Sequence, residues 1–130
     1  MTAERVMAPH LRVWVLEDER TVFGDHEMRL LEAIAREGTL TDGAAKLGLS
    51  YRSAWGKIKD AETALGAKLV ETTVGGSRGG SSRLTPEAVR LVEQYIRFRD
   101  AVGAYAQQEF ARCFGGSGVC DKPTINEGAV

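Results

Sequence analysis

One predicted helix in the middle of the chain carries the side chains best suited to binding a charged partner. With 3.6 residues per turn, its small and aliphatic residues share one face, which we expect to be the core face. That face holds Ala54, Ile58, Ala61 and Leu65, and the opposite face holds Arg52, Gly56, Lys59 and Thr63. An arginine can contact guanine through two hydrogen bonds, and a lysine suits phosphate. A glycine there costs about 1 kcal/mol of helix propensity but permits close approach of a surface such as the major groove. The alternative is an amphipathic helix with a merely solvated face.

A glycine-rich loop gives the second signal. Gly75–Ser82 holds four glycines and three serines around Arg78, and Arg83 follows directly. Glycine tolerates positive φ, and an arginine at the tip of such a loop can enter a minor groove or contact phosphate. A nucleotide-binding loop would require a helix directly after the loop, and usually a Gly-Lys-Ser/Thr element, whereas we expect a strand there. A loop that is merely flexible is the other alternative.

Groups with catalytic or metal-binding spacing are not evident. His10 and His26 lie far apart, and neither cysteine has a recognisable base beside it. Cys113 and Cys120 supply two thiols, whereas a structural zinc site usually takes four ligands, so they are weak candidates for a metal or redox switch. We therefore predict that the chain is not an enzyme, and no cofactor is evident.

The elements around these residues predict a mainly α fold with small β hairpins, an α+β winged helix-turn-helix. Strands are expected at 11–16 and 20–23, and a helix follows from about residue 25 and ends at Gly38, with an apolar stripe of Met28, Leu31, Ile34 and Ala35. Thr41 is expected to cap a short second helix with Ala44, Ala45 and Leu47 directed inward, and Ser50 to cap the third, Tyr51–Leu65. Strands at 68–74 and 83–85 would flank the glycine-rich loop and form the wing.

A long helix is predicted from residue 86, where Pro86 follows the cap Thr85, to residue 112. Its apolar residues recur at alternating spacings of four and three, as in a coiled-coil seam. They are Leu91, Tyr95, Phe98, Val102 and Tyr105. We expect this helix to pair with a second copy, so that a homodimer presents two recognition helices to a palindromic site. The alternative is that it folds back on the helical core.

Composition and charge set the remaining limits. The chain has 130 residues with a formal net charge of −1, but residues 44–85 carry seven basic and three acidic side chains. Positive charge is thus concentrated where a DNA-binding surface would need it. No apolar stretch is long enough to span a membrane, and no signal peptide is evident, so we expect a cytoplasmic protein. We expect residues 1–10 to be flexible, 11–85 to form the winged domain, 86–112 the dimerisation helix, and 113–130 a disordered Gly-rich tail.

The sequence resembles the N-terminal domain of the ModE-type molybdate-responsive regulators, which is related to the LysR-type DNA-binding domain. The resemblance covers about residues 11–100 and is carried by the segments 30–41, Ala44–Gly48, Ser50–Trp55, Leu69–Glu71, the paired glycines, and Leu84-Thr85. It implies a winged helix-turn-helix, a homodimer joined partly through its long helix, and DNA recognition by the Ser50–Lys59 helix and the wing. Members that sense molybdate carry a further C-terminal oxyanion-binding region, which we expect this chain to lack. Asp42-Gly43 departs from the neutral or polar residues expected there.

These inferences converge on a sequence-specific DNA-binding transcriptional regulator whose effector is not indicated. Tyr51 and Trp55 should flank the recognition helix, half packed and half available to DNA. The residues expected to contact DNA are Thr41, Ser50, Tyr51, Arg52, Ser53, Trp55, Gly56, Lys59, Arg78, Ser81, Ser82 and Arg83. One alternative is a winged-helix module that binds a protein, which the acidic first third would suit. Another is a regulator that responds to thiol oxidation or metal through the tail cysteines.

Overall fold

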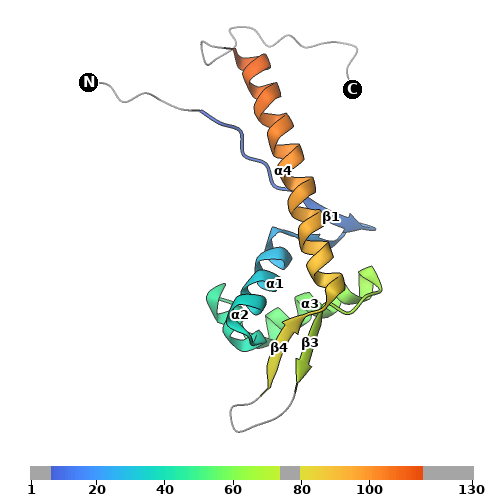
Figure 1. Cartoon of the computed structure of the whole chain (residues 1–130). Helices are drawn as coiled ribbons and strands as arrows, with labels where there is room; N and C mark the ends of the chain where they lie inside the picture. The colour runs from blue at the N-terminus through green and yellow to red at the C-terminus, as the bar shows by residue number, and fades with distance from the viewer. Residues whose placement is uncertain (1–6, 74–79, 116–130) are drawn as a thin grey trace, which may run out of the picture. The chain divides into compact units, whose positions relative to one another are not determined.

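The computed structural model describes residues 7–73 and 80–115, which contain four helices and two antiparallel strand pairs (Figure 1). In chain order the elements are β1 (Trp14–Glu17), β2 (Arg20–Gly24), α1 (Asp25–Glu37), α2 (Leu40–Lys46), α3 (Tyr51–Leu65), β3 (Val70–Thr73), β4 (Ser81–Leu84) and α4 (Pro86–Phe114). Residues 12–98 form one compact unit, and the described residues on either side belong to a second. The predicted flexible segment 1–10 lies partly, and the predicted tail 113–130 mostly, outside the described residues.

Helix α1 forms for the reasons its sequence suggests. Acidic side chains occupy its first turn and a basic one its last, which suits the helix dipole. Gly38 ends the helix in the left-handed conformation, with φ of 85°, and donates its N–H to the carbonyl oxygen of Ile34. Met28, Leu31 and Ile34 are buried as predicted, but Ala35 is exposed. The buried apolar stripe therefore excludes Ala35 and includes Leu30 and Ala33, which were not predicted.

The cap of α2 differs from the prediction. Thr39, and not Thr41, is the N-cap, and its hydroxyl accepts the N–H of Asp42 at 3.0 Å. A capping hydroxyl bonds an N–H two or three residues ahead, so a helix that begins at Leu40 places its cap at residue 39. Thr41 then lies in the first turn with its side chain exposed. Ala45, predicted to point inward, is also exposed.

Close packing between α1 and α2 explains why residue 43 is a glycine, one of the two positions at which the sequence departs from the family pattern. A Cβ atom built on Gly43 would lie 2.9 Å from the backbone nitrogen and from the Cγ1 atom of Ile34. Real Cβ contacts are essentially never this short, so only glycine lets the two helices approach at this distance. Residue 43 is therefore set by helix packing, and the neighbouring Asp42 is exposed.

Helix α3 has the predicted bounds and the predicted cap, with the Ser50 hydroxyl accepting the N–H of Ser53 at 3.1 Å. Its core face consists of Ala54, Ile58 and Ala61, all buried. Leu65, predicted on the same face, is 39% exposed. The last turn of α3 extends past the core, and Gly66 ends the helix there with φ of 68°.

The wing hairpin pairs Val70 with Leu84 and Thr73 with Ser81 in an antiparallel ladder. Its second strand begins two residues earlier than predicted and stops before Thr85. The Thr85 hydroxyl instead donates to the carbonyl oxygen of Lys68 at 2.6 Å and accepts the N–H of Ala88 at 3.1 Å, capping α4. In the first hairpin, by contrast, β1 begins later than predicted, since residues 11–13 lie outside it.

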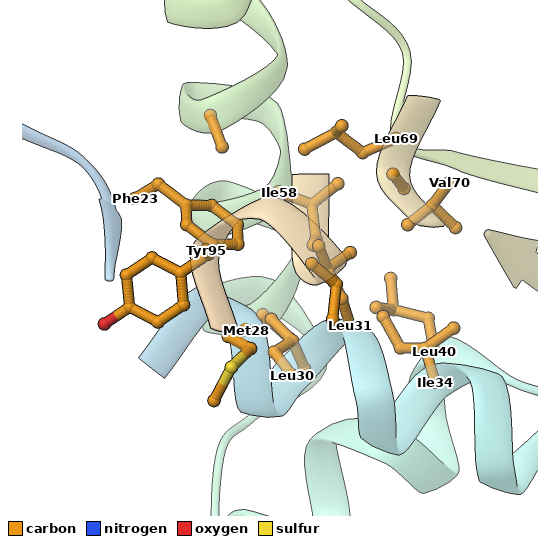
Figure 2. Close-up of a cluster of buried hydrophobic side chains, with 14 of the residues drawn as sticks. Phe23, Met28, Leu30, Leu31, Ile34, Leu40, Ile58, Leu69, Val70 and Tyr95 are labelled. Atoms are coloured by element: carbon orange, nitrogen blue, oxygen red, sulfur yellow. The ribbon is translucent and has the colours of Figure 1, made fainter. Parts of the chain in front are cut away.

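The first part of α4 completes the core of the larger unit. Ala88, Val92 and Tyr95 are buried, and Leu91 packs against the same cluster. The Tyr95 and Phe23 rings meet edge to face with centroids 5.2 Å apart (Figure 2).

Tyr95 was predicted to lie in a dimer seam, and that prediction is wrong. Its hydroxyl lies 2.6 Å from the carbonyl oxygen of Val13 and 2.8 Å from a carboxylate oxygen of Asp25. The side chain is therefore used within its own chain, and Leu91 is also engaged by the core. The helix ends at Phe114, two residues beyond the predicted end. Across the described segments, none of the helices combines the length and hydropathy needed to cross a membrane.

Candidate nucleic-acid interface

The outer face of α3 is open at its centre. A Cβ atom built on Gly56 would meet no heavy atom of the described residues within 4 Å, so their packing does not require a glycine at this position. Arg52, one turn earlier, is exposed, and no ion pair or hydrogen bond of its guanidinium occurs among the described residues. Ser53 is exposed beside it. The predicted groove face thus holds an available cation next to a surface that a partner can approach closely.

The two flanks of α3 differ in character. On one flank, Lys57 and Asp60 line a hollow that is also lined by β2 and the start of α1. On the other flank, Tyr51 and Trp55 stack with ring planes 7° from parallel and centroids 6.4 Å apart. These two rings are 53% and 38% exposed, so they form an aromatic pair on the surface of the helix.

Lys59 follows Trp55 by one turn and is already partnered. Its Nζ atom lies 4.3 Å from the centroid of the Trp55 ring, close enough for a cation–π interaction. The same atom lies 3.1 Å from Oε1 of Glu62. Lys59 was predicted to contact phosphate, and in this structure its ammonium is shared between an aromatic face and a carboxylate.

Glu62 is the functional residue that the sequence reasoning missed. Its Oε2 atom accepts the N–H of Leu69 at 2.7 Å and the N–H of Val70 at 3.3 Å, at the start of β3. Burial alone would raise the pKa of the Glu62 carboxyl, but the hydrogen bonds from Leu69, Lys59 and Val70 outweigh burial and hold the pKa below its ordinary value. The position three residues after Lys59 was the available signal, since it places the two side chains on one helix face.

Of the four wing residues predicted to contact DNA, two have exposed side chains in the structure. Arg83 is exposed and lies 3.5 Å from a carboxylate oxygen of Glu71. Ser81 is exposed, with its hydroxyl 2.6 Å from that of Thr73. Arg78 lies outside the described residues.

Ser82 is a correction to the predicted wing surface. The residue is buried, its hydroxyl accepts the N–H of Leu40 at 3.3 Å, and its own N–H donates to the carbonyl oxygen of Gly38 at 2.7 Å. Alternation along β4 turns this side chain inward, toward the turn between α1 and α2. Ser82 therefore joins the wing to the helix-turn-helix and is not available to an external partner.

Of the two cysteines, Cys113 belongs to the described part of the chain. Cys113 lies in the last turn of α4, is exposed, and has its Sγ atom 3.8 Å from Oε2 of Glu109. Cys120 lies outside the described residues. Over residues 7–73 and 80–115, no three His, Cys, Asp or Glu side chains are grouped closely enough to hold a metal ion.

A family model identifies the domain that carries this surface. Residues 26–89, from the first turn of α1 to the first turn of α4, match the bacterial regulatory helix-turn-helix proteins of the LysR family. Because of this match, residues 26–89, just under half of the chain, are called the LysR-family domain below. The match includes all of α2, α3 and the wing, so the open face of α3 lies inside the domain.

Curated relatives confirm the resemblance to ModE-type proteins. The chain is 38% identical over 95 residues to the molybdenum transport protein ModE of Azotobacter vinelandii, covering 73% of this chain and 34% of the relative. It is 36% identical over 81 residues to the DNA-binding transcriptional dual regulator ModE of Escherichia coli strain K12, covering 62% and 31%. The chain thus spans about a third of the length of these relatives.

Solved structures confirm the fold of the LysR-family domain. The crystal structure of the CbnR DNA-binding domain in complex with DNA matches 67% of this chain and 94% of that chain, with a TM-score of 0.51 and 22% identity. Full-length CbnR complexed with its target DNA gives a TM-score of 0.52 at 21% identity, over 68% of this chain and 29% of that one. The predicted winged helix-turn-helix is therefore the observed fold.

The Glu62 carboxylate gives a prediction for stability. Because its pKa is lower in the folded chain than the ordinary value of 4.5, its stabilising contribution is complete above that pH. The contribution is lost as the pH falls through the folded pKa. We expect Glu62→Gln to lower the free energy of unfolding at neutral pH by about 1–3 kcal/mol and to flatten the loss of stability on acidification. Urea unfolding followed by circular dichroism over a pH series measures both effects.

Glu71→Gln is the matched control, because Glu71 is an exposed carboxylate on β3, the strand whose start Glu62 contacts. Its effect on the free energy of unfolding should stay below about 1 kcal/mol. Identical pH profiles for the wild type and Glu62→Gln would contradict the role assigned to Glu62.

Proposed function

We propose that the LysR-family domain binds duplex DNA sequence-specifically and that the chain acts as a transcriptional regulator. The proposal rests on the outer face of α3, where Arg52 is exposed without an ion pair among the described residues and Gly56 is open to close approach. A guanidinium in that position suits the O6 and N7 atoms of guanine in the major groove. A helix that enters the major groove needs a hydrogen-bond donor for the base edges. It also needs a position without a bulky side chain, where it can approach the DNA closely.

The N-terminus of α3 adds to this argument. Its first turn contains no acidic side chain, and Ser50 caps it with a neutral hydroxyl. The positive end of the helix dipole is therefore left for an external anion, and a backbone phosphate is such an anion. Residues 44–85, which include α3 and the wing, also carry the basic excess of the chain. Phosphate contacts and base contacts would then come from the same end of the helix.

The known proteins support the same function. The Escherichia coli relative is named as a DNA-binding transcriptional dual regulator, and the CbnR structures contain DNA. We carry DNA binding from these proteins to this chain because the shared region is the helix-turn-helix domain itself. Our proposed contacts among the described residues remain Thr41, Ser50, Tyr51, Arg52, Ser53, Trp55, Gly56, Lys59, Ser81 and Arg83, of which Gly56 and Lys59 are half-buried and the rest are exposed. Arg78 is proposed from its sequence position.

We also propose that the chain acts as a homodimer on a palindromic site. Phe98 and Tyr105 on α4 are 54% and 63% exposed, and a spacing of seven residues places two side chains on one face of a helix. Val102, between them, is half-buried. Exposed aromatic rings at this spacing suit pairing with the same helix of a second copy. Two copies would present two α3 helices to successive major grooves.

The first test of DNA binding is fluorescence anisotropy with random-sequence duplex DNA over a salt series. We expect binding that weakens steeply as salt rises, because each phosphate contact releases condensed counterions. The logarithm of the affinity should fall linearly with the logarithm of the salt concentration. Absence of binding at low salt, with the folded protein confirmed by circular dichroism, would contradict the proposal and favour a protein-binding module.

Arg52→Ala tests the recognition helix directly. On a duplex selected by the wild type from a random library, we expect it to weaken binding by about 1–3 kcal/mol and to relax the base preference at one position. Arg90→Ala, at an exposed arginine on α4, is the control and should bind as the wild type does. Equal weakening by Arg52→Ala on selected and random duplexes would assign Arg52 to phosphate and not to a base.

Phe98→Glu tests the dimer. Loss of an aromatic hot spot at an interface costs about 2 kcal/mol or more, so the dimer dissociation constant should rise by about thirtyfold or more. Sedimentation equilibrium measures this constant. Val89→Glu is the matched control, since Val89 is exposed on the same helix, nine residues away and so on the opposite side. A dimer of unchanged affinity in Phe98→Glu would exclude this face as the interface.

A further inference from the structure

We infer that the stacked pair Tyr51 and Trp55 reads the C5 methyl groups of thymine in the major groove, and that Lys59 positions this pair. The inference rests on the proposed DNA binding and specifies the chemistry of part of that surface. The pair lies on the exposed part of α3, with its two residues one turn apart and Arg52 beside them.

The exposure of the two rings is the first argument. Tyr51 and Trp55 remain 53% and 38% exposed on a helix whose core face is complete without them. Large aromatic surfaces left in water beside a binding face are typical of contacts that become buried with the partner. Arg52 lies between them in sequence and supplies the positive charge that a DNA surface requires.

The second argument is that the rings are held in place before any partner binds. Lys59 lies over the Trp55 ring, and Glu62 fixes Lys59 at 3.1 Å. Glu62 is itself held by two backbone N–H groups at the start of β3. The Trp55 ring is thus connected through two side chains to the base of the wing, so little conformational entropy is lost when the ring is buried.

The arrangement also distinguishes duplex DNA from single strands. The Lys59 ammonium lies 4.3 Å from the centroid of the Trp55 ring, and Tyr51 stacks beside that ring with centroids 6.4 Å apart, so part of the Trp55 face is already occupied within the chain. Proteins that bind single strands offer open aromatic faces on which bases stack. A ring whose face is partly occupied offers its exposed edge, which fits a small apolar group. The thymine methyl is the apolar group that the major groove displays.

The test compares thymine with uracil in the same sequences. Duplexes selected by the wild-type protein are amplified with either dTTP or dUTP, which removes the methyl groups and keeps Watson–Crick pairing. We expect the wild type to bind the uracil pool about four- to fifteenfold more weakly, the range for one or two buried methyl groups. In Trp55→Ala and Tyr51→Ala this thymine-to-uracil ratio should fall toward one, while the salt dependence of binding persists.

Trp14→Ala is the matched control, because Trp14 is an equally exposed aromatic on β1 and should leave the ratio unchanged. Lys59→Met should lower the ratio and Lys59→Arg should restore it, which separates positioning of the ring from loss of a phosphate contact. Equal binding to both pools, or an equal loss on uracil DNA in the wild type and Trp55→Ala, would overturn the inference while leaving DNA binding intact. Absence of salt-dependent binding to either pool would instead overturn the proposed function.

Discussion

The Glu62 carboxylate connects the two parts of the molecule on which DNA recognition would depend. One oxygen accepts the N–H groups of Leu69 and Val70 where the wing begins, and the other contacts the Lys59 ammonium on α3. A buried donor without an acceptor costs about 1–3 kcal/mol, so the start of β3 is held where this carboxylate lies. Ser82 fixes β4 to the turn between α1 and α2 in the same way. Both strands of the wing are therefore tied to the helix-turn-helix at their base.

These hydrogen bonds distinguish the polar side chains that are engaged within the chain from those that are available to a partner. Ser82, Glu62 and the Tyr95 hydroxyl are engaged within the chain, and Lys59 is partly engaged. Arg52 is exposed and has no such partner among the described residues. A rigid support with a few available donors loses little entropy on binding, which is how a short helix can discriminate among sequences. The bound state would add contacts without rebuilding the surface that makes them.

Helix α4 changes in character along its length. Its first turns supply Ala88, Val92 and Tyr95 to the core, and Phe98 beyond them is exposed. The buried pattern also explains how a chain only 22% identical to CbnR keeps the same fold, since a fold requires apolar residues at the right period more than particular residues.

The sequence by itself determined the helix-turn-helix, the wing, the core face of α3 and the cap at Ser50, because periodicity, capping residues and glycine positions act locally. It did not determine which polar side chains form hydrogen bonds within the chain and which remain available to a partner. The N-cap of α2 is Thr39 and not the predicted Thr41, because the helix begins two residues earlier than predicted. Ser82, Tyr95 and Glu62 were decided by partners between seven and 82 residues away in the chain. Such hydrogen bonds exist only once the elements have packed, so only the tertiary structure could show which side chains remain free to bind.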